Sequence, residues 1–445
     1  MNNKLACIIL AAGKGTRMKS DLPKPLHPIA GKPMVQHVLD SCKALNPEKI
    51  VTVISPDTPA LEHALSTDSL TAIQPVANGT GGAALAARKH LDGFDGDILV
   101  IFGDTPLVQT ETLETMITTR HAAPDAGLVF SAFETQTPTG YGRMILNEDG
   151  TLDQIVEEKD ANDEQRKITL CNGGIVCADG KRLFQWLDQV GNDNAQGEYY
   201  LVDLPQIARR ENCLTRISMI TEEETAGINS RADQAHVEGL MQNRLRQNIM
   251  AQGVTLIDPN TVYLQSDTQI EKDVTIYPNV VFGPNVQIES GVTIHPFSHL
   301  ENCIVRKHAE IGPYARIRPG TDIGENAVIG NFVELKSTTI GAKSKAKHFS
   351  YLGNTTVGEK ANIGAGTMTA NYNGYEKFET TIEDGVSTGI NTSLVAPITL
   401  GKDSIIAAGS TLTKDLPGGD LGLGRSKQVN IDGWATKFRS SKEKK

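Results

Sequence analysis

Apolar side chains recur at every sixth position over a long stretch in the second half of the chain. The first run comprises Leu264, Ile270, Ile276, Phe282, Ile288, Ile294 and Leu300. An amphipathic helix spaces its apolar residues by three and four, and a half-buried strand by two, so a period of six belongs to neither. It is typical of short strands wound into a triangular coil, in which three hexapeptides make one turn and the long apolar side chains point inward. The spacing therefore predicts a parallel β-helix.

The period slips by one residue after this run and then resumes. It continues at Ile311, Ile317, Ile323 and Ile329, in islands at 340–352 and 357–363, at Ile382 and, past Thr388, at Leu394, Leu400, Ile406 and Leu412. Between Ile363 and Ile382 the interval is one residue longer than a full coil, and the segment 365–381 is polar and contains aromatic residues and glycines. We therefore expect one coil to carry a projecting loop here.

The first 230 residues follow a different pattern. Continuously apolar runs at 5–10, 49–55 and 97–102 are interspersed with helical stretches such as the amphipathic segment 34–45. This alternation predicts a mostly parallel α/β sheet covered on both faces. Ligands of such sheets bind beyond the carboxyl ends of the strands. Residues 11–18 and 103–104 follow two of the strands, so the sequence predicts a ligand site at that edge.

The loop after the first strand, AAGKGTRM at 11–18, has the composition of a phosphate-binding turn. Its glycines allow backbone N–H groups to approach a phosphate closely, and Lys14, Arg17 and Lys24 add positive charge. The glycine pattern alone is weak evidence, because this is not a Walker A loop and similar turns often serve structural roles. Asp104, at the end of its strand, suits Mg²⁺. The alternative for this aspartate is a helix N-cap.

A helical stripe lies between the two patterns. It comprises Ala232, Ala235, Val237, Leu240, Met241, Leu245 and Ile249, and Gly253 stops it. A chain of 445 residues exceeds what one core usually supports. We expect a first domain at 1–229, a linker helix at 230–250 and a second domain at 251–445. The helix could equally belong to the core of the first domain.

Composition narrows the range of partners. The net charge of −10 argues against nucleic-acid binding, and the short basic tail at 437–445 is more typical of a solvated end. Six cysteines without CxxC spacing indicate reduced thiols in a cytoplasmic protein, not a disulfide frame or a zinc site. The apolar run 5–12 is too short to span a membrane and leads directly into Gly13, so it is a strand and not a signal peptide.

Longer motifs in the first half are more specific. LAAGKGTRM at 10–18 followed by LPKPL at 22–26 resembles the sugar-1-phosphate nucleotidyltransferases. Further motifs follow in that family's order, namely Gln74, 78–82, 103–104, 140–143, Glu157, Asn172 and 228–229. The segment 191–203 resembles the N-acetylglucosamine-1-phosphate uridylyltransferases in particular. Gly173 departs from the pattern, because a hydroxyl residue is usual there, and this affects only fine sugar contacts.

This resemblance implies that a sugar-phosphate oxygen attacks the α-phosphorus of UTP and releases pyrophosphate, a reaction that depends mainly on positioning and charge neutralisation. Asp104 and Asn229 would hold Mg²⁺, Arg17 the departing pyrophosphate and Lys24 the sugar phosphate, and Arg17 and Lys24 would be the catalytic cations. Gln74 and the backbone of 79–80 would read the base. The full nucleotide- and sugar-binding set would be Leu10, Ala11, Ala12, Gly13, Lys24, Gln74, Gly79, Thr80, Phe102, Gly103, Asp104, Gly142, Glu157, Asn172 and Asn229.

The second half carries its own motifs. ARIRPG at 315–320, GNFVELK at 330–336, KHFSYLG at 347–353, ANIGAGT at 361–367 and ANYNG at 370–374 resemble the acetyltransferase half of the bacterial bifunctional uridylyltransferase/glucosamine-1-phosphate N-acetyltransferases. A lone histidine on a repeat is usually structural. The resemblance instead implies that His348 is the general base for attack of the sugar amine on acetyl-CoA, a role that suits imidazole at neutral pH.

The same resemblance implies a left-handed coil and a homotrimer with acetyl-transfer sites between neighbouring chains. Glucosamine 1-phosphate would be bound by Arg318, Lys336, Tyr351 and Asn362, and acetyl-CoA by Ala365, Asn371, Tyr372, Ala408 and Arg425. Two departures stand out: Ile390 occupies the place of a serine that usually touches acetyl-CoA, and Gly424 that of a serine that usually precedes the arginine.

The expected protein is thus a bifunctional enzyme that acetylates glucosamine 1-phosphate and then forms UDP-N-acetylglucosamine, a precursor of peptidoglycan and lipopolysaccharide. One alternative is a monofunctional nucleotidyltransferase with a regulatory β-helix, as in glucose-1-phosphate adenylyltransferases. It is disfavoured by the joint presence of Lys336, His348 and Tyr351. Another is a non-catalytic exchange factor or scaffold subunit, which is disfavoured because Lys24 and Asp104 are both present.

Overall fold

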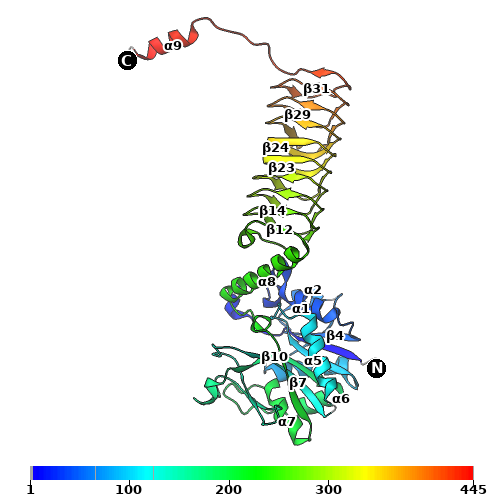
Figure 1. Cartoon of the computed structure of the whole chain (residues 1–445), viewed down its shortest axis with the longest axis vertical. Helices are drawn as coiled ribbons and strands as arrows, with labels where there is room; N and C mark the ends of the chain where they lie inside the picture. The colour runs from blue at the N-terminus through cyan, green and yellow to red at the C-terminus, as the bar shows by residue number, and fades with distance from the viewer. Residues whose placement is uncertain (1–3, 66, 124, 444–445) are drawn as a thin grey trace. The chain divides into compact units, whose positions relative to one another are not determined.

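The structure, a computed structural model, describes residues 4–65, 67–123 and 125–443. By its internal contacts the chain divides between Asn243 and Arg244 into two units, and each is described by itself (Figure 1). Helix α8 (Arg231–Ala251) runs across this division. Among the described residues, no helix is long and apolar enough to cross a membrane.

The first unit contains a mostly parallel sheet, as the sequence predicts. Strand β1 pairs in parallel with β4 and β6, and β10 runs antiparallel between β6 and β7. The strand order is β11-β7-β10-β6-β1-β4-β5, and β8 and β9 extend it beside β10. The strands are β1 (Leu5–Leu10), β4 (Lys49–Ile54), β5 (Leu70–Ile73), β6 (Asp97–Phe102), β7 (Ala126–Glu134), β8 (Arg143–Leu146), β9 (Leu152–Val156), β10 (Leu170–Asp179) and β11 (Leu214–Met219), with a small hairpin of β2 (Pro28–Ile29) and β3 (Lys32–Pro33).

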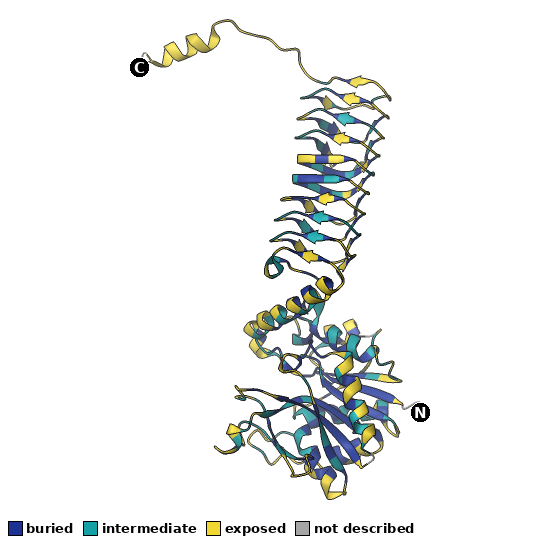
Figure 2. Ribbon diagram, in the orientation of Figure 1, coloured by how far each residue is buried: buried dark blue, intermediate teal, exposed yellow. Residues whose placement is uncertain are grey.

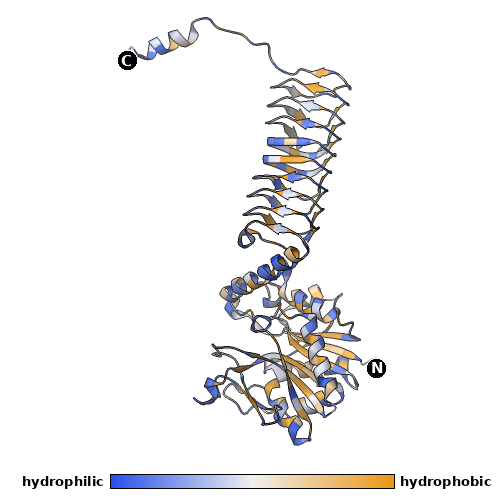
Figure 3. Cartoon of the chain, viewed as in Figure 1, coloured by the Kyte–Doolittle hydropathy of each residue, from blue (hydrophilic) through white to orange (hydrophobic). Residues whose placement is uncertain are grey.

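Both faces of this sheet are buried. Alternate residues of β1 enter different cores, Ile8 on one face and Cys7 and Ile9 on the other. This alternation follows from the period of two in a strand, and it explains why the central strands are continuously apolar, orange in Figure 3. The covering helices are α1 (Met34–Lys43), α2 (Pro59–Leu65) and α5 (Thr110–Ala122) on one face, and α3 (Thr80–Ala86), α4 (Arg88–Leu91), α6 (Gly180–Leu187) and α7 (Leu204–Arg210) on the other.

The second unit is the left-handed parallel β-helix that the period of six and the family resemblance predict. Most strands pair in parallel with the third strand that follows, so three strands make one coil. The strands are β12 (Thr255–Leu256), β13 (Gln269–Ile270), β14 (Thr275–Ile276), β15 (Val281–Phe282), β16 (Val286–Ile288), β17 (Thr293–Ile294), β18 (His299–Leu300), β19 (Cys303–Val305), β20 (Glu310–Ile311), β21 (Arg316–Ile317), β22 (Thr321–Ile323), β23 (Val328–Ile340), β24 (Lys345–Val357), β25 (Asn362–Ile363), β26 (Met368–Ala370), β27 (Thr380–Ile382), β28 (Ser387–Thr388), β29 (Ser393–Val395), β30 (Ile398–Leu400), β31 (Ile405–Ile406), β32 (Thr411–Leu412) and β33 (Leu421–Gly422).

The periodic apolar residues fill the interior of the coil. Leu264, Phe282, Ile317 and Ile406, for example, are almost fully buried in one continuous cluster. Side chains between them face outward, which gives the alternating bands of Figure 2. The interior is therefore packed from end to end, and ligands can approach these coils only from outside.

The projecting loop is confirmed, and it lies between β26 and β27. Thr355 pairs with Thr380, whereas Thr380 pairs with Ile398, so the coil that contains residues 371–379 is longer than the one after it. Beyond the coils, the tail forms helix α9 (Trp434–Glu443), whose side chains are exposed. All six cysteines are free and buried.

Candidate active sites

The first site lies where β1 and β6 end side by side. Leu10 and Phe102, the last residues of these strands, are register partners, and Gly103 N donates to Leu10 O at 2.9 Å. The loop after each strand therefore begins at the same sheet edge. This is the edge at which the sequence predicted a ligand site.

These loops and α3 surround a cavity of about 220 Å³. Most of the residues that the family resemblance implied for nucleotide binding line it, namely Leu10, Ala11, Ala12, Gly13, Lys24, Gln74, Gly79, Thr80, Phe102, Gly103 and Asp104. Pro25, Ala77, Ala83 and Glu198 line it as well and were not predicted. Glu198 lies in the segment 191–203, which the sequence singled out without assigning a contact.

Two glycines allow this cavity to form. Gly15 has a φ of +60°, and a Cβ there would lie 2.6 Å from Lys24 Cβ, so only glycine lets Lys24 pack against the loop. Gly79 has a φ of +106°, and its Cβ would lie 2.4 Å from Tyr199 O. Tyr199 N donates to Asn78 O at 2.8 Å, so the segment 191–203 docks onto the 78–81 loop through backbone contacts that need this glycine.

The Gln74 side chain is buried and its orientation is fixed. Its amide nitrogen donates to Asn78 Oδ1 at 2.9 Å and to Gly79 O at 3.1 Å. Since the amide hydrogens point to the protein, the amide oxygen is the atom of this side chain that suits a donor on a ligand.

Lys24, Asp104 and Asn229 meet at one point. Lys24 Nζ donates to Asp104 Oδ2 at 2.5 Å and to Asn229 Oδ1 at 2.9 Å. Ile228 N donates to Asp104 O at 3.1 Å, which brings the two distant segments together. A carboxylate and an amide oxygen that converge on one cation are a hard-oxygen donor pair. They fit a divalent ion that completes its shell with waters and phosphate oxygens.

Arg17 lies outside the cavity. It is exposed on the short helix η1 (Thr16–Met18). Burial acts to raise the pKa of Asp233, but hydrogen bonds from Asn229 and Ser230 hold it below its usual range, and the charge of Arg17 adds a smaller lowering. Arg17 is thus close enough to Asp233, four residues after Asn229, for the two charges to interact.

A second cavity, of about 350 Å³, adjoins the first through Thr80 and Phe102. Glu157 and Asn172, both implied as sugar contacts, line it. Gly142 is close, because a Cβ there would lie 3.3 Å from Glu157 Oε1. Burial, followed by the charges of Asp160 and Asp203, raises the pKa of Glu157.

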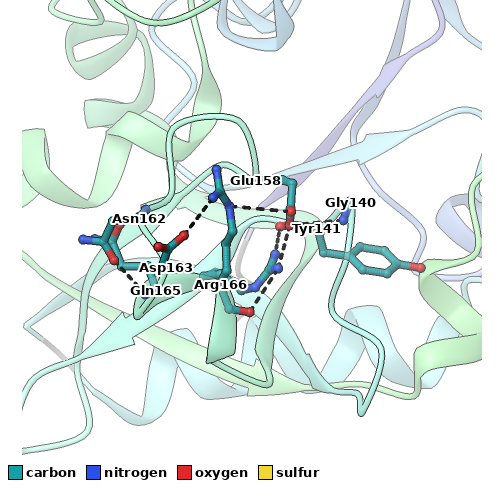
Figure 4. A network of polar contacts seen from close by, with 8 residues as sticks. Gly140, Tyr141, Glu158, Asn162, Asp163, Gln165 and Arg166 are labelled. Carbon is teal, nitrogen blue, oxygen red and sulfur yellow. Dashed lines mark hydrogen bonds and ion pairs between the residues drawn. The ribbon is translucent and has the colours of Figure 1, made fainter.

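The turn that carries Gly142 is held by a buried arginine, Arg143. Figure 4 shows Gly140 and Tyr141 of this turn beside Glu158. Arg143 Nη2 donates to Glu158 Oε2 at 2.6 Å, and Gly140 N donates to the same oxygen at 3.3 Å. The hydrogen bond from Arg143 is the main cause of the lowered pKa of Glu158. The GYGR motif at 140–143 is therefore fixed against the residue that follows Glu157.

Gly173 lacks the hydroxyl side chain that the family pattern has at this position, and a hydroxyl from another strand lies next to it. A Cβ at this position would lie 2.6 Å from the Ser131 hydroxyl, which is fully buried and accepts from Ile175 N at 2.9 Å. A hydroxyl from β7 therefore lies beside this position in the present chain.

The second unit gathers cations at one corner of the coil. Arg318 Nη1 donates to Glu334 Oε1 at 2.7 Å. The charge of Lys377 is the main cause of a lowered pKa of Lys336, and Arg318 contributes. Like charges held together in this way suit a phosphate group. Lys377 was not predicted, because only the fold of the projecting loop brings it beside Lys336.

Tyr351 and Asn371 lie close to this corner. A Cβ on Gly353 would lie 2.4 Å from Tyr351 Oη and 2.8 Å from Asn371 Nδ2, so both polar groups lie over this glycine. Asn371 Nδ2 donates to Asn354 Oδ1 at 2.8 Å. Tyr372 is exposed, and its hydroxyl donates to Gly374 O at 2.6 Å.

His348 lies on β24, which pairs with the strand of Lys336. A row of residues implied for acetyl-CoA follows it on the next coils. His348 is exposed, and it is the register partner of Asn331. On the following coils, Asn391 N donates to Ala365 O at 2.7 Å and Gly409 N to Ile390 O at 2.8 Å. Arg425, Ala408 and Ile390 continue the row. Arg425 Nη1 donates to Ala408 O at 2.7 Å, and Ile390 is more than half exposed.

A single chain does not bring all the implied sugar-phosphate residues together. Lys336 lies five residues after Asn331, the partner of His348, and the chain bends between them at Phe332, whose φ is +57°. Asn362 lies on a different side of the coil, where it pairs with Lys345 and Ser387. It lines a shallow hollow with Lys343, Lys345 and Lys360.

The geometry defines a nucleotidyltransferase joined to a hexapeptide-repeat transferase, and comparison with known proteins agrees. Residues 7–168 match the MobA-like NTP transferase domain, residues 267–302 the bacterial transferase hexapeptide and residues 299–413 the GMPPB C-terminal domain. The proteins named "Bifunctional protein GlmU" of Paramagnetospirillum magneticum and Sphingopyxis alaskensis are 45% and 47% identical, and in both cases the alignment covers 100% of this chain and 98% of the relative.

The chain belongs to this family of bifunctional GlmU proteins, which confirms the resemblance that the motifs indicated. Its NTP transferase and hexapeptide units fit uridylyl transfer and acetyl transfer, and it is an enzyme with both activities. Membership of the family also indicates metal-dependent nucleotidyl transfer on small-molecule substrates, and hexapeptide repeats indicate oligomerisation.

Proposed function

We propose that the chain converts glucosamine 1-phosphate, acetyl-CoA and UTP to UDP-N-acetylglucosamine, with acetyl transfer first. Residues 251–445 carry out acetyl transfer, residues 1–229 carry out uridylyl transfer, and 230–250 link them. The observation that carries this proposal is the presence of two separate site sets, Lys24 with Asp104 in one unit and His348 with its acetyl-CoA row in the other. UTP and acetyl-CoA are cytoplasmic metabolites, so we place the enzyme in the cytoplasm.

In uridylyl transfer, a phosphate oxygen of N-acetylglucosamine 1-phosphate attacks the α-phosphorus of UTP, and the bond to the β-phosphate breaks to release pyrophosphate. Gln74 offers an acceptor to the uracil N–H, since its amide hydrogens are used by the protein. Lys24 neutralises the sugar phosphate, and Arg17, at the open side, meets the departing pyrophosphate. Charge neutralisation and alignment supply most of the catalysis.

Mg²⁺ is the metal that we propose for Asp104 and Asn229. When bound, it would neutralise phosphate charge and orient the triphosphate. The two oxygens that accept from Lys24 Nζ would hold it. The ammonium is then free to pair with the sugar phosphate that we assign to it.

The second cavity accepts the hexose. Gly142, Glu157 and Asn172 contact its hydroxyl and acetamido groups, with Glu157 as an acceptor. The short distance from a Cβ on Gly142 to Glu157 supports this grouping, because any larger residue would narrow the space beside the carboxylate. The Arg143–Glu158 contact keeps this turn in place.

In acetyl transfer, the neutral amine of glucosamine 1-phosphate attacks the thioester carbon of acetyl-CoA. A C–N bond forms, the C–S bond breaks, one amine proton passes to His348 Nε2 and CoA leaves as the thiol after protonation. Arg318, Lys336, Tyr351 and Asn362 hold the sugar phosphate. Ala365, Asn371, Tyr372, Ala408 and Arg425 hold acetyl-CoA. We assign Lys377 to the phosphate as well, because of its proximity to Lys336.

We propose that the active form is a homotrimer whose neighbouring chains complete each acetyl-transfer site. One chain separates Lys336 and Asn362 from each other, on different sides of the coil. A neighbouring copy that packs against the coil could bring its Asn362 to the Lys336 of the first chain. This supports a shared site.

A ridge of exposed aromatic rings marks the surface that a second copy would cover. It comprises Phe297, Tyr314, Phe332 and Phe349, which lie on successive coils and are each roughly half exposed. Phe349 directly follows His348 in the chain. The Phe297 and Tyr314 ring centroids are 4.9 Å apart and those of Tyr314 and Phe332 5.1 Å apart. All four residues have a positive φ, which costs a bulky residue roughly 1–2 kcal/mol. A partner that buries the rings offsets this cost.

The decisive experiment is an omission assay on the purified protein. With glucosamine 1-phosphate, acetyl-CoA, UTP and Mg²⁺ present, we expect UDP-N-acetylglucosamine, CoA and pyrophosphate. Omitting UTP should leave CoA release intact, and omitting acetyl-CoA should abolish pyrophosphate release unless N-acetylglucosamine 1-phosphate is added. Pyrophosphate release without any CoA release would instead indicate the monofunctional alternative.

Reciprocal variants assign each activity to its unit. Each activity is assayed with its own substrates, glucosamine 1-phosphate with acetyl-CoA for one and N-acetylglucosamine 1-phosphate with UTP for the other. In these assays we expect His348→Ala to abolish CoA release and to leave pyrophosphate release unchanged. Asp104→Ala should do the reverse, because the proposed metal ligand is lost. Equal loss of both activities in either variant would reject two independent sites.

A further inference from the structure

The imidazole of His348 has one hydrogen-bond partner among the described side chains around it, and that partner is neutral. His348 Nδ1 and Asn331 Oδ1 are 3.0 Å apart, across register partners on β24 and β23. An amide oxygen only accepts, so this geometry requires the proton of neutral imidazole to be on Nδ1. The lone pair is then on Nε2, the nitrogen that accepts the amine proton in the mechanism above.

The backbone of His348 is held independently. The buried hydroxyl of Ser350 donates to His348 O at 2.9 Å, and the continuous pairing of β24 with β23 fixes the strand on which the ring lies. Asn331 is half-buried and therefore has less freedom than the exposed ring. The asparagine is the fixed member of the pair, and the histidine is the one that it orients.

We propose that Asn331 is a positioning residue for acetyl transfer, and this inference rests on the proposed function of His348. It selects the tautomer with Nδ1–H and directs Nε2 away from the coil toward the sugar amine. When the imidazolium forms during the reaction, Nδ1–H still donates to Asn331 Oδ1, so no contact is broken as the proton arrives. The hydrogen bond that orients the base is thus retained throughout the step.

The neutrality of this partner has a consequence. An aspartate in its place would favour the imidazolium and leave less free base at neutral pH. On the paired strand β23 the register partner of His348 is the uncharged Asn331, and the charged residues Glu334 and Lys336 pair further along, with Tyr351 and Gly353. The charges on its own strand are those of Lys345 and Lys347. The ring is thus oriented by a hydrogen bond to a neutral amide.

The test compares Asn331→Ala and Asn331→Asp with a control variant, Thr339→Ala, which is exposed on the same strand and outside both proposed sites. For Asn331→Ala we expect the kcat of acetyl transfer to fall roughly 10- to 100-fold with unchanged KM for both substrates, as for other partners that orient a histidine. Uridylyl transfer should not change, and an unchanged sedimentation coefficient shows that the β-helix is still folded.

Two readouts separate positioning from a merely structural role. In Asn331→Asp, the pH at which kcat falls on the acid side should rise by about one unit. The carboxylate favours the protonated ring, so the free base forms only at higher pH. At enzyme concentrations high enough to detect the trace of acetyl transfer that remains without the base, Asn331→Ala should have no further effect in a His348→Ala background, because the residue that it orients is gone.

The inference is overturned if Asn331→Ala retains kcat within twofold, if the loss is equal in the His348→Ala background, or if the profile of Asn331→Asp does not move. Any of these results with an inactive His348→Ala variant rejects the role of Asn331 alone. An active His348→Ala variant would instead reject the proposed base and, with it, the function from which this inference starts.

Discussion

In the first unit, loops from distant parts of the chain meet at one sheet edge and surround a cavity. In the second unit, the implied residues lie along the outside of a coil whose interior is filled by apolar side chains. The difference follows from the two folds. A sheet with crossover helices leaves a crevice where strands end, whereas stacked coils present convex faces. A site on such a face needs a second surface to exclude water and to surround its ligand.

This contrast supports the proposal that the first unit forms its site alone and that the second shares its site with a neighbouring copy. Lys24, Asp104 and Asn229 are far apart in sequence and meet within hydrogen-bonding distance in a single chain. Lys336 and Asn362 are closer in sequence, yet they occupy different sides of the coil. The β-helix orders residues along rows and cannot fold back on itself to bring the rows together.

The largest effect should come from removing the ridge. We expect the double variant Tyr314→Ser/Phe332→Ser to weaken assembly roughly 100-fold, since half-exposed rings that a partner buries contribute about 1–1.5 kcal/mol each to an interface. Acetyl transfer should disappear at dilutions where the chains separate, and uridylyl transfer should persist. Analytical ultracentrifugation and both assays at matched concentrations measure this.

The matched control for the ridge is Tyr263→Ser, which removes a half-exposed ring from an earlier coil outside the ridge. It should leave assembly and both activities unchanged. A dispersed variant that still acetylates glucosamine 1-phosphate would contradict the contrast between the units, because the coil would then complete its site alone.

Within the second unit, Lys377→Ala should raise the KM for glucosamine 1-phosphate roughly tenfold and change kcat little, since a charge-assisted phosphate contact is lost before the chemical step. Lys414→Ala, an exposed lysine on a later coil, is the control.

In the wild type, the lowered pKa of Lys336 means that it loses its proton at a lower pH than an ordinary lysine. Affinity should therefore fall on the alkaline side, and Lys377→Ala should move this fall to higher pH. An unchanged KM would remove Lys377 from the site.

In the first unit, the geometry predicts that Lys24 and the metal ion compete for the oxygens of Asp104 and Asn229. Without UTP, Lys24→Met should bind Mn²⁺ roughly tenfold more tightly than the wild type, because the ammonium that now lies 2.5 Å from Asp104 Oδ2 is removed. Lys14→Met, an exposed lysine on the loop that follows β1, should bind as the wild type does. Electron paramagnetic resonance of free Mn²⁺ gives the affinities, and weaker binding by Lys24→Met would contradict the shared position.

Much of this architecture could be predicted from the sequence because it is periodic. The interior residues of the coil repeat every six positions, and each of Ile276, Ile317 and Leu400 lies where the period requires. The continuously apolar strands of the first unit likewise indicated a sheet buried on both faces. Periodicity reports which side of an element is buried, and from that the fold class follows.

The contacts between side chains could not be predicted in this way. The position of Lys377 depends on how the inserted loop returns to the coil, and that of Glu198 on the docking of Tyr199 against Gly79. Neither is encoded in a local pattern. The pairing of Asn331 with His348 could have been found from sequence alone, because they lie seventeen positions apart, about one coil, but only the register of β23 and β24 shows which atoms face each other.

The smallest effect concerns the sugar cavity, where acidity should separate the two activities. Burial, then Asp160 and Asp203, raises the pKa of Glu157, while Arg143 and Lys159 oppose this rise. A carboxyl with a raised pKa takes up its proton at a higher pH than an ordinary glutamate.

As the pH falls, Glu157 should therefore cease to accept from the sugar, and the KM for N-acetylglucosamine 1-phosphate should rise roughly threefold, which corresponds to a hydrogen bond of modest strength. Glu157→Gln is neutral at every pH and should show the raised KM throughout without this dependence. Asp163→Asn, on an almost fully exposed acid of the neighbouring loop, should keep the wild-type profile. Measuring KM between pH 5 and 8 for the three proteins decides the matter, because a dependence that persists in Glu157→Gln would assign the titration to another group.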